Sequence, residues 1–240
     1  MQNAVRWVKA VLYWALGKSD PRYVLIKSQL VLLAARWGLY EREIYSQLPR
    51  LLTEGDVAVD VGANCGVYAR RFMECVGRRG QVYAFEPNPS YGPFLRRISV
   101  NGRLVNVYDK AVSDERGILF LDVPRIEGGA PEPALASVGA DGHGAMRVEA
   151  VTLDQALGTL ERLDVLKIDV EGGEIAALRG ATALLRRFRP AIIVETLEPA
   201  RLSQFFEDEH LSYRYQCGGQ WHALSHASHR TDATYVLRWQ

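Results

Sequence analysis

The pattern of apolar and polar positions divides the chain into two parts. Up to about residue 53, apolar residues recur at helical spacing. Helices are expected over 2–16, 23–37 and 41–52. From residue 54 onward, short apolar runs alternate with amphipathic stretches, which is typical of βα units. We therefore predict a helical segment, 1–53, packed on an α/β domain formed by 54–240.

Several strands of the α/β part are apolar throughout, as parallel strands buried on both faces are. Strands are expected over 57–61, 81–85, 105–108, 164–170, 191–194 and 234–239. Helices are expected over 67–76, 91–100, 174–188 and 201–209. Residues 213–217 and 221–224 flank two glycines and are expected to form a β-hairpin.

An insertion over 113–152 interrupts this alternation. Within it, 118–123 and 147–152 are predicted to pair as strands. The stretch between them, 124–146, holds three prolines and five glycines and is predicted to be a loop. A loop of this length in a compact domain is either functional or disordered, so a substrate lid and plain disorder both stay open.

Composition and charge exclude several classes of protein. The chain has 48% hydrophobic and 24% charged residues, as globular domains do, and its formal net charge is +1. This balance gives no basic field of the kind that gathers nucleic acid, so no nucleic-acid partner is expected. Three cysteines without zinc-type spacing favour free thiols and a cytoplasmic location.

The first residues leave two interpretations open. The apolar run over 2–16 is interrupted by Arg6 and Lys9 and is too short to span a bilayer. It either docks on the body of the protein or makes weak peripheral contact with a membrane through residues 1–16. The predicted location is therefore cytoplasmic, with membrane-peripheral attachment as the alternative.

A glycine-containing turn follows the first predicted strand, where open parallel sheets bind ligands. In the sequence DVGANCG, Gly62 permits a tight turn and Gly66 lets the next helix begin close to the sheet. A dinucleotide fingerprint would need a further glycine where Asn64 stands. A diphosphate also needs exposed N–H groups, and Asp60 would repel it. The turn therefore favours a cationic ligand over a diphosphate.

Glu86 stands at the end of the second predicted strand, twenty residues beyond Gly66. A carboxylate at this point can accept hydrogen bonds from both hydroxyls of a ribose. Pro87 and Pro89 stiffen the loop that presents it. Together, the turn and the carboxylate predict an adenosine-binding site.

These motifs resemble those of a known family. The series DVGANCG, YAFEPNP, DKAVSD and LKIDVEGGE, followed by ALRGATALL and PAIIVE, is similar to the FkbM-type family of S-adenosylmethionine-dependent methyltransferases. The likeness covers about residues 40–200. It implies a class I methyltransferase fold, which is a Rossmann-like, seven-stranded, mostly parallel sheet with its last strand antiparallel and helices on both faces. It also implies S-adenosyl-L-methionine as the cofactor.

Carried onto this sequence, the resemblance implies a set of cofactor-binding residues. The methionine portion would be held by the glycine turn, the ribose by the loop after the second strand, and the adenine by apolar contact after the third. The implied residues are Asp60, Gly62, Ala63, Asn64, Gly66, Glu86, Pro87, Asn88, Ala111, Val112 and Asp169.

The segment KIDVEG ends the fourth predicted strand beside the expected position of the methyl group. An alcohol acceptor must lose a proton, so a nearby base is useful. Asp169 or Glu171 is the candidate for that base or for orienting the hydroxyl, and Glu195 is a further candidate. Glu171 could instead be a negative charge near the N-terminus of the next helix, where it interacts favourably with the helix dipole. Lys167 is either a buried partner of Asp169 or an edge charge. No metal is expected, although a divalent ion on Asp169 and Glu171 stays open.

The resemblance thus predicts an O-methyltransferase acting on a hydroxyl of a sugar, a glycolipid or a polyketide-like small molecule. Two alternatives remain on the same architecture. One is an NAD-type oxidoreductase, and the other is a catalytically inert nucleotide-binding or membrane-associated scaffold. The sequence does not indicate the oligomeric state.

Overall fold

A computed structural model describes residues 29–31, 33–34, 42–122, 137–138, 146–217, 220–224 and 233–240. The predicted helix over 2–16 and most of the one over 23–37 lie outside these residues, as does the proposed membrane contact. Within the described ranges, no helix has the length and apolar character that a membrane crossing requires.

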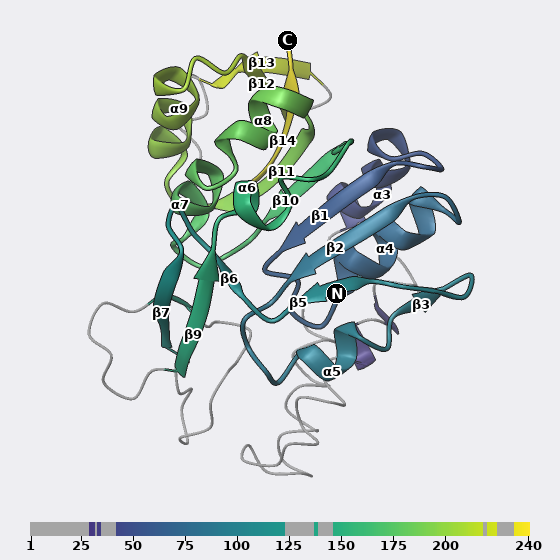
Figure 1. The fold of residues 1–240 in the computed structure, drawn as a ribbon. Coiled ribbons are helices and arrows are strands. Elements are labelled where there is room, and N and C mark those ends of the chain that lie inside the picture. The colour runs from purple at the N-terminus through teal and green to yellow at the C-terminus, as the bar shows by residue number, and fades with distance from the viewer. Residues whose placement is uncertain are drawn as a thin grey trace.

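The main sheet has the strand order β13-β12-β14-β11-β10-β1-β2-β5 (Figure 1). Five neighbouring strands are parallel: β1 (Val57–Val61), β2 (Gln81–Phe85), β5 (Asn106–Tyr108), β10 (Val165–Ile168) and β11 (Ala191–Thr196). Three more strands follow beyond β11: β14 (Ala233–Trp239), β12 (Tyr213–Cys217) and β13 (Gln220–Ala223). The last strand, β14, is antiparallel to β11, as predicted. Seven of these strands form the mostly parallel sheet that the resemblance implies, and the hairpin strand β13 adds an eighth.

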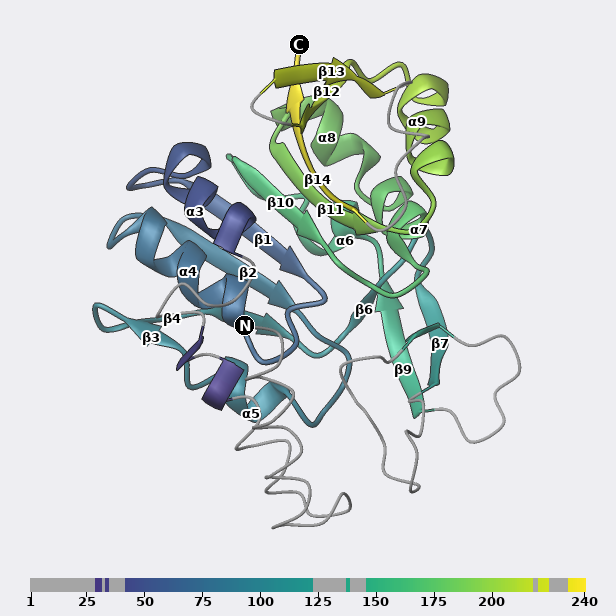
Figure 2. The ribbon, with the colours of Figure 1, turned by 180° about the vertical axis from the view of Figure 1, so that it is seen from behind.

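Helices cover both faces of this sheet (Figures 1 and 2). One face carries α3 (Arg42–Leu51), α4 (Val67–Val76) and the short α5 (Gly92–Leu95), and the other carries α6 (Leu153–Ala156), α7 (Glu174–Arg179), α8 (Thr182–Phe188) and α9 (Pro199–Asp208). Strand alternation divides the core between them. Ala58 packs with the α4 side, whereas Val59 and Val61 pack with the α7 to α9 side.

Two predicted helices differ from the observed ones. The helix expected over 91–100 ends at Leu95, and a hairpin of β3 (Ser99–Val100) and β4 (Arg103–Leu104) follows. Asn101 and Gly102 form its turn, both with positive φ, which is the Asn-Gly hairpin signal. The helix expected over 174–188 is divided at Gly180, whose carbonyl accepts from the Asp154 N–H at 2.9 Å, while the Asp154 carboxylate accepts from the N–H groups of Ala183 and Leu184 at the start of α8.

The predicted strand pair of the insertion is confirmed. It forms part of a second sheet of order β6-β9-β7-β8, in which β7 and β9 are antiparallel. Its strands are β6 (Ala111–Val112), β7 (Gly117–Asp122), β8 (Ser137–Val138) and β9 (Met146–Val151). This sheet lies beside the carboxyl ends of β1 and β2 (Figure 1). Of the proposed lid over 124–146, only 137–138 and Met146 are described.

Candidate functional site

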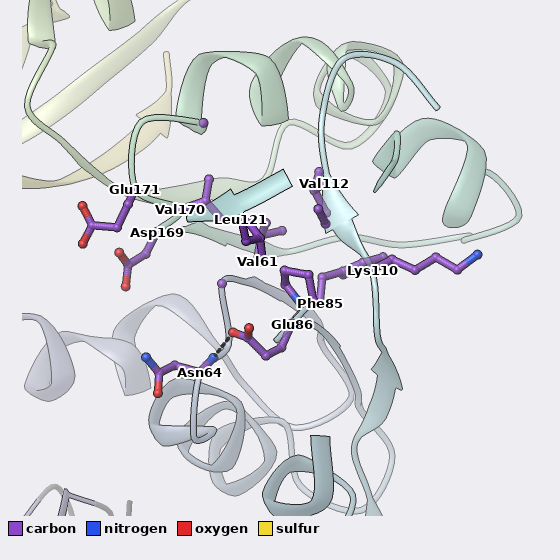
Figure 3. A pocket seen from close by; sticks show the side chains of 14 residues that line it. Val61, Asn64, Phe85, Glu86, Lys110, Val112, Leu121, Asp169, Val170 and Glu171 are labelled. Carbon is purple, nitrogen blue, oxygen red and sulfur yellow. Dashed lines mark hydrogen bonds between the residues drawn. The ribbon is translucent and has the colours of Figure 1, made fainter. Parts of the chain in front are cut away.

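A pocket that opens to solvent lies at the carboxyl ends of β1, β2 and β10. It is lined by Val61, Gly62, Asn64, Phe85, Glu86, Pro87, Lys110, Ala111, Val112, Leu121, Asp169, Val170, Glu171 and Gly173. In Figure 3 the side chains of Asp169 and Glu171 lie on one side of the pocket, and that of Lys110 lies on the opposite side.

The turn after β1 forms one wall of the pocket, and its shape depends on Gly62. This residue has a φ of 75°, and a Cβ on it would lie 1.8 Å from the carbonyl oxygen of Asp169. Any side chain there would therefore push β1 and β10 apart at their ends. The close approach of the two strands requires glycine at this position.

Every backbone N–H from residue 62 to residue 66 donates a hydrogen bond within the protein. The N–H groups of Gly62 and Ala63 donate to the carbonyl of Phe85 at 3.0 and 3.1 Å. The next three donate to the carboxylate of Glu86, the side-chain oxygen of Asn64 and the carbonyl of Ala63, in chain order. The turn therefore has its donors already occupied, which a diphosphate-binding loop does not.

Glu86 holds the turn against the loop that follows β2. Its Oε2 accepts from the Asn64 N–H at 2.7 Å, and its Oε1 accepts from the Asn88 N–H at 2.9 Å. The side chain is only 7% exposed. Burial raises the pKa of Glu86 to about 7, although these two hydrogen bonds oppose the shift. The carboxyl group is therefore poised to change charge near neutral pH.

Asn88 is buried behind Glu86, at 2% exposure. Its side-chain nitrogen has no hydrogen-bond acceptor in the described part of the chain. A buried donor without an acceptor is costly, so this group is suited to a ligand or a water molecule. Asn88 does not itself line the pocket.

Lys167 is buried beneath the side of the pocket that carries Asp169. Its ammonium donates to Asp169 Oδ2 at 3.0 Å and to the carbonyl of Gly62 at 3.1 Å. It also lies 3.3 Å from Oδ1 of Asp60 and 5.1 Å from the ring centroid of Tyr68. Of the two interpretations of Lys167, the structure therefore favours the buried partner of Asp169.

Asp60 is fully buried and does not line the pocket. Burial raises the pKa of its carboxyl, and the ammonium of Lys167 opposes that rise. The contact with Lys167 is an ion pair and not a well-directed hydrogen bond. The predicted direct contact of Asp60 with the cofactor therefore has no support from its position.

Glu171 reaches the pocket from the loop between β10 and α7 and is exposed. Burial of the carboxyl and the nearby charge of Asp169 raise its pKa above the ordinary value. This shift makes Glu171 a better proton acceptor than a fully solvated glutamate. Its position agrees with the predicted role as a base or as a group that orients a hydroxyl.

Glu174 is a candidate that the sequence reasoning missed. Its side chain is 7% exposed, and its Oε1 accepts from the N–H of Gly172 at 3.1 Å. Burial, together with the charges of Glu171 and Asp169, raises the pKa of Glu174 to about 7. The hydrogen bond from Gly172 to Glu174 holds the loop that carries Glu171. The signal was available, because Glu174 ends the motif LKIDVEGGE.

The structure brings together only part of the predicted set. Seven predicted cofactor residues line the pocket: Gly62, Asn64, Glu86, Pro87, Ala111, Val112 and Asp169. Asp60, Ala63, Gly66 and Asn88 are near it in the chain but do not line it, and neither does Glu195, which is exposed on β11. Reasoning from the sequence missed Leu121 and Lys110 as lining residues.

Among the described residues, no three His, Cys, Asp or Glu side chains gather as a metal site would require.

Comparisons with known proteins identify the family of this chain. A family model, the methyltransferase FkbM domain, matches residues 60–218. Hexuronic acid methyltransferase AglP of Haloferax volcanii is 27% identical over 180 residues, covering 72% of this chain and 70% of the relative. Methyltransferase sdnD of Sordaria araneosa is 28% identical over 173 residues, covering 59% of this chain and 66% of the relative.

A solved structure has a similar fold. It is a methyltransferase FkbM from Methylobacillus flagellatus, with a TM-score of 0.55 at 15% identity. The match covers 84% of this chain but 47% of that chain, so the present chain spans about half of the solved protein. At this identity the likeness concerns the fold alone.

Proposed function

Because this chain belongs to the FkbM methyltransferase family, whose cofactor is S-adenosylmethionine, we propose that it methylates a hydroxyl group of a small molecule. The acceptor class that we propose is a sugar, a glycolipid or a polyketide-like compound. The family match runs from the glycine turn to the end of β12. The choice of a hydroxyl acceptor goes beyond that match and is our own inference.

The observation that carries the proposal is the state of the glycine turn. All N–H groups from residue 62 to residue 66 already donate to acceptors of the protein, so none is left to bind a diphosphate. The pocket also has carboxylates on Asp169 and Glu171 at one side. S-adenosylmethionine carries a sulfonium, an ammonium and a single carboxylate, and its net charge is therefore positive. These features favour it over NAD, the cofactor of the alternative oxidoreductase.

The residues present fit this cofactor. Glu86 would accept from the ribose hydroxyls, since a carboxylate has lone pairs beyond the two that its N–H partners use. Ala111, Val112 and Leu121 offer an apolar surface suited to the adenine. Asp169 would face the methionine portion. When bound, S-adenosylmethionine supplies an electrophilic methyl group on a positively charged sulfur.

We propose that Glu171 accepts the proton of the acceptor hydroxyl. It stands at the mouth of the pocket beside Asp169, and its raised pKa suits this task. Glu174 would hold the Glu171 loop in place through its bond to Gly172. Glu195 is a weaker candidate, since it is not among the lining residues. Alignment of the two reactants would supply the larger part of the acceleration, because effective molarity can contribute about 7 to 11 kcal/mol.

A sugar-like acceptor is suggested by one relative, AglP, whose name describes a hexuronic acid methyltransferase. We also propose a cytoplasmic location. The weak membrane contact through residues 1–16 remains a proposal, since it falls outside the described residues.

Calorimetry tests the cofactor assignment. The protein should bind S-adenosylhomocysteine and should not bind NAD. If it bound NAD and not S-adenosylhomocysteine, the methyltransferase proposal would fail. If it bound both S-adenosylhomocysteine and NAD weakly and transferred no labelled methyl group to any acceptor in a screen of sugars and polyols, the inert scaffold would be the better description.

The role of Glu171 is tested by Glu171→Gln with an acceptor found in that screen. Turnover should fall by about 100-fold, the usual contribution of a base, while the Kd for S-adenosylhomocysteine stays within about twofold. Glu195→Gln tests the second candidate, on the neighbouring strand, and should change turnover little if Glu171 is the base. Full activity of Glu171→Gln would assign the base elsewhere.

A further inference from the structure

Asp60 and Lys167 form a buried charged pair that spans two strands. They are register partners on the parallel strands β1 and β10, so their side chains lie on the same face of the sheet. That face is the one covered by α4, where the ring of Tyr68 lies over the Lys167 ammonium. Asp60 is 0% exposed and Lys167 is 4% exposed.

By the same alternation, the residues two positions further along each strand lie on the same face as Asp60 and Lys167. Gly62 is two residues beyond Asp60, and Asp169 is two residues beyond Lys167. Asp169 and Gly62 line the pocket, whereas Asp60 and Lys167 lie below it. The ammonium of Lys167 therefore contacts a buried carboxylate at 3.3 Å and a pocket carboxylate at 3.0 Å.

With both carboxyl groups ionised, one positive charge is shared between two negative ones, which leaves one net negative charge. Because Asp60 is wholly buried, it cannot exchange the ammonium for water, and its ionised form depends on Lys167. Asp169 is different, since its side chain is 37% exposed and can face a ligand. The net negative charge of the three groups is therefore available at the pocket, on Asp169.

We propose that Asp60 is a positioning residue that acts on the bound cofactor through Lys167. Because the ammonium of Lys167 also compensates the charge of Asp60, it does not fully neutralise Asp169. The negative charge that remains on Asp169 favours a sulfonium in the pocket. Without Asp60, Lys167 would neutralise Asp169 completely, and the pocket would lose its preference for a cationic ligand. This inference rests on the proposed function, which places the sulfonium on the side of Asp169.

The test compares two ligands that differ in charge at sulfur. S-adenosylmethionine is a sulfonium, and S-adenosylhomocysteine is the neutral thioether that lacks the methyl group. The ratio of their Kd values, measured by calorimetry at about pH 8, reports the charge of the pocket. A purely structural defect weakens both ligands alike and does not move this ratio.

Asp60→Asn should shift the ratio against S-adenosylmethionine by about five- to tenfold. The double variant Asp60→Asn, Lys167→Met removes both members of the pair and leaves the charge of Asp169, so its ratio should return to within about twofold of the wild-type value. Replacing both members of a buried pair is usually tolerated better than removing one, so the double variant is expected to fold. If Asp60→Asn does not fold, Asp60→Ser, which leaves room for a water molecule beside the ammonium, takes its place and is judged by the same ratio.

The matched control is Asp56→Asn. Asp56 is also a buried carboxylate, 5% exposed, but it lies at the opposite end of β1 and pairs with Arg162. This variant should lower stability without moving the ratio.

Three results overturn the proposal. An unchanged ratio in Asp60→Asn would mean that Asp60 is only structural. A ratio in the double variant as low as that expected for Asp60→Asn would mean that Asp60 acts directly, without Lys167. If the wild-type protein bound neither ligand, the proposed function would fail and this inference with it, whereas wild-type binding of both isolates a failure of the inference alone.

Discussion

Glu86 combines burial, two backbone hydrogen bonds and a pKa of about 7, so its charge decides how well it can accept from a ribose. The charged groups that act on it are Lys167, which favours the ionised form, and Asp60, which disfavours it. Hydroxyl donors favour the carboxylate over the carboxylic acid. With the proposed contact between Glu86 and the ribose, we therefore expect cofactor binding to be coupled to the loss of a proton from Glu86.

The affinity for S-adenosylhomocysteine should fall as the pH decreases through 7. With one proton and a pKa of about 7, the Kd should be about tenfold higher at pH 6 than at pH 8. Calorimetry in buffers of different ionisation enthalpy should detect proton release near pH 6. Glu86→Gln should bind more weakly and lose the pH dependence.

Glu174→Gln is the control for this measurement, because the pKa of Glu174 is also about 7. Glu174 is not among the residues that line the pocket, so this variant should keep the tenfold change. If Glu174→Gln removed the pH dependence and Glu86→Gln did not, the ribose would have to be bound elsewhere.

The sequence predicted Glu86 well because its signal is local, a carboxylate at a strand end at a fixed spacing from a glycine turn. The contact between Lys167 and Asp60 was harder to predict. Strand alternation indicates the face on which each side chain lies but not which strand lies beside it. Their contact depends on the pairing of β1 with β10, which are over a hundred residues apart. Glu174 was missed because a glutamate in a first helical turn has an ordinary explanation.

Among the strands, β7 has a different role on each of its two faces. Leu121 points into the pocket and is 5% exposed, whereas Ile118 lies on the opposite face and is 40% exposed. The insertion thus contributes a wall of the pocket beside Ala111 and Val112. Leu121→Ala should raise the Kd for S-adenosylhomocysteine by about three- to tenfold, because about 1 kcal/mol of apolar contact is lost.

Ile118→Ala is the matched control on the same strand and should leave the Kd unchanged. Circular dichroism checks that both variants fold. Equal effects of the two substitutions would show that β7 acts on the fold and not on the ligand.

Gly180, between α7 and α8, lies so close to the carbonyl of Ser113 that a side chain does not fit there. Gly180→Ala places a methyl group 2.0 Å from that oxygen, so the backbone must shift. We expect a loss of about 2 kcal/mol or more in the free energy of unfolding, measured with urea. Gly117→Ala, where a Cβ meets no atom within 4 Å, should change it by less than about 0.5 kcal/mol.

Elements with local signals were predicted with the observed bounds. The expected ranges 57–61, 81–85 and 67–76 are those of β1, β2 and α4, because each is a clear apolar or amphipathic run between turn residues. The division at Gly180 could not be predicted, since it depends on hydrogen bonds with Asp154, which is distant in the chain. The hairpin at Asn101-Gly102 could have been predicted, because an Asn-Gly dipeptide is a strong turn signal.

For the folded chain as a whole, buried carboxyl groups set the pH dependence of stability. The folded-state pKa of Glu86 and of Glu174 is about 7, above the ordinary value of 4.5 expected on unfolding. Between these values the folded protein binds more protons than the unfolded one. The stability of the unliganded protein should therefore fall as the pH rises from about 4.5 to about 7.

Urea unfolding at about pH 5 and about pH 8 measures this effect. The double variant Glu86→Gln, Glu174→Gln should show a smaller difference between the two conditions than the wild-type protein. A wild-type stability that rises with pH over this interval would contradict the assignment of the two groups.

The arrangement of the sheet followed from alternation and from the family resemblance, including the antiparallel β14. The eighth strand, β13, was expected as half of a hairpin, but its addition to the main sheet depends on the pairing of β12 with β14. The wall formed by the insertion depends on how two sheets meet, and no local pattern of residues encodes that.

The hydrogen bonds of the glycine turn, residues 62 to 66, affect how a ligand enters the pocket. Since its five N–H groups have acceptors before any ligand arrives, the wall that they form is preorganised. Ligand entry then requires no local refolding, and the amide hydrogens of residues 62 to 66 should exchange slowly with deuterium even in the free protein. Rapid exchange that slows only after ligand addition would instead indicate induced fit.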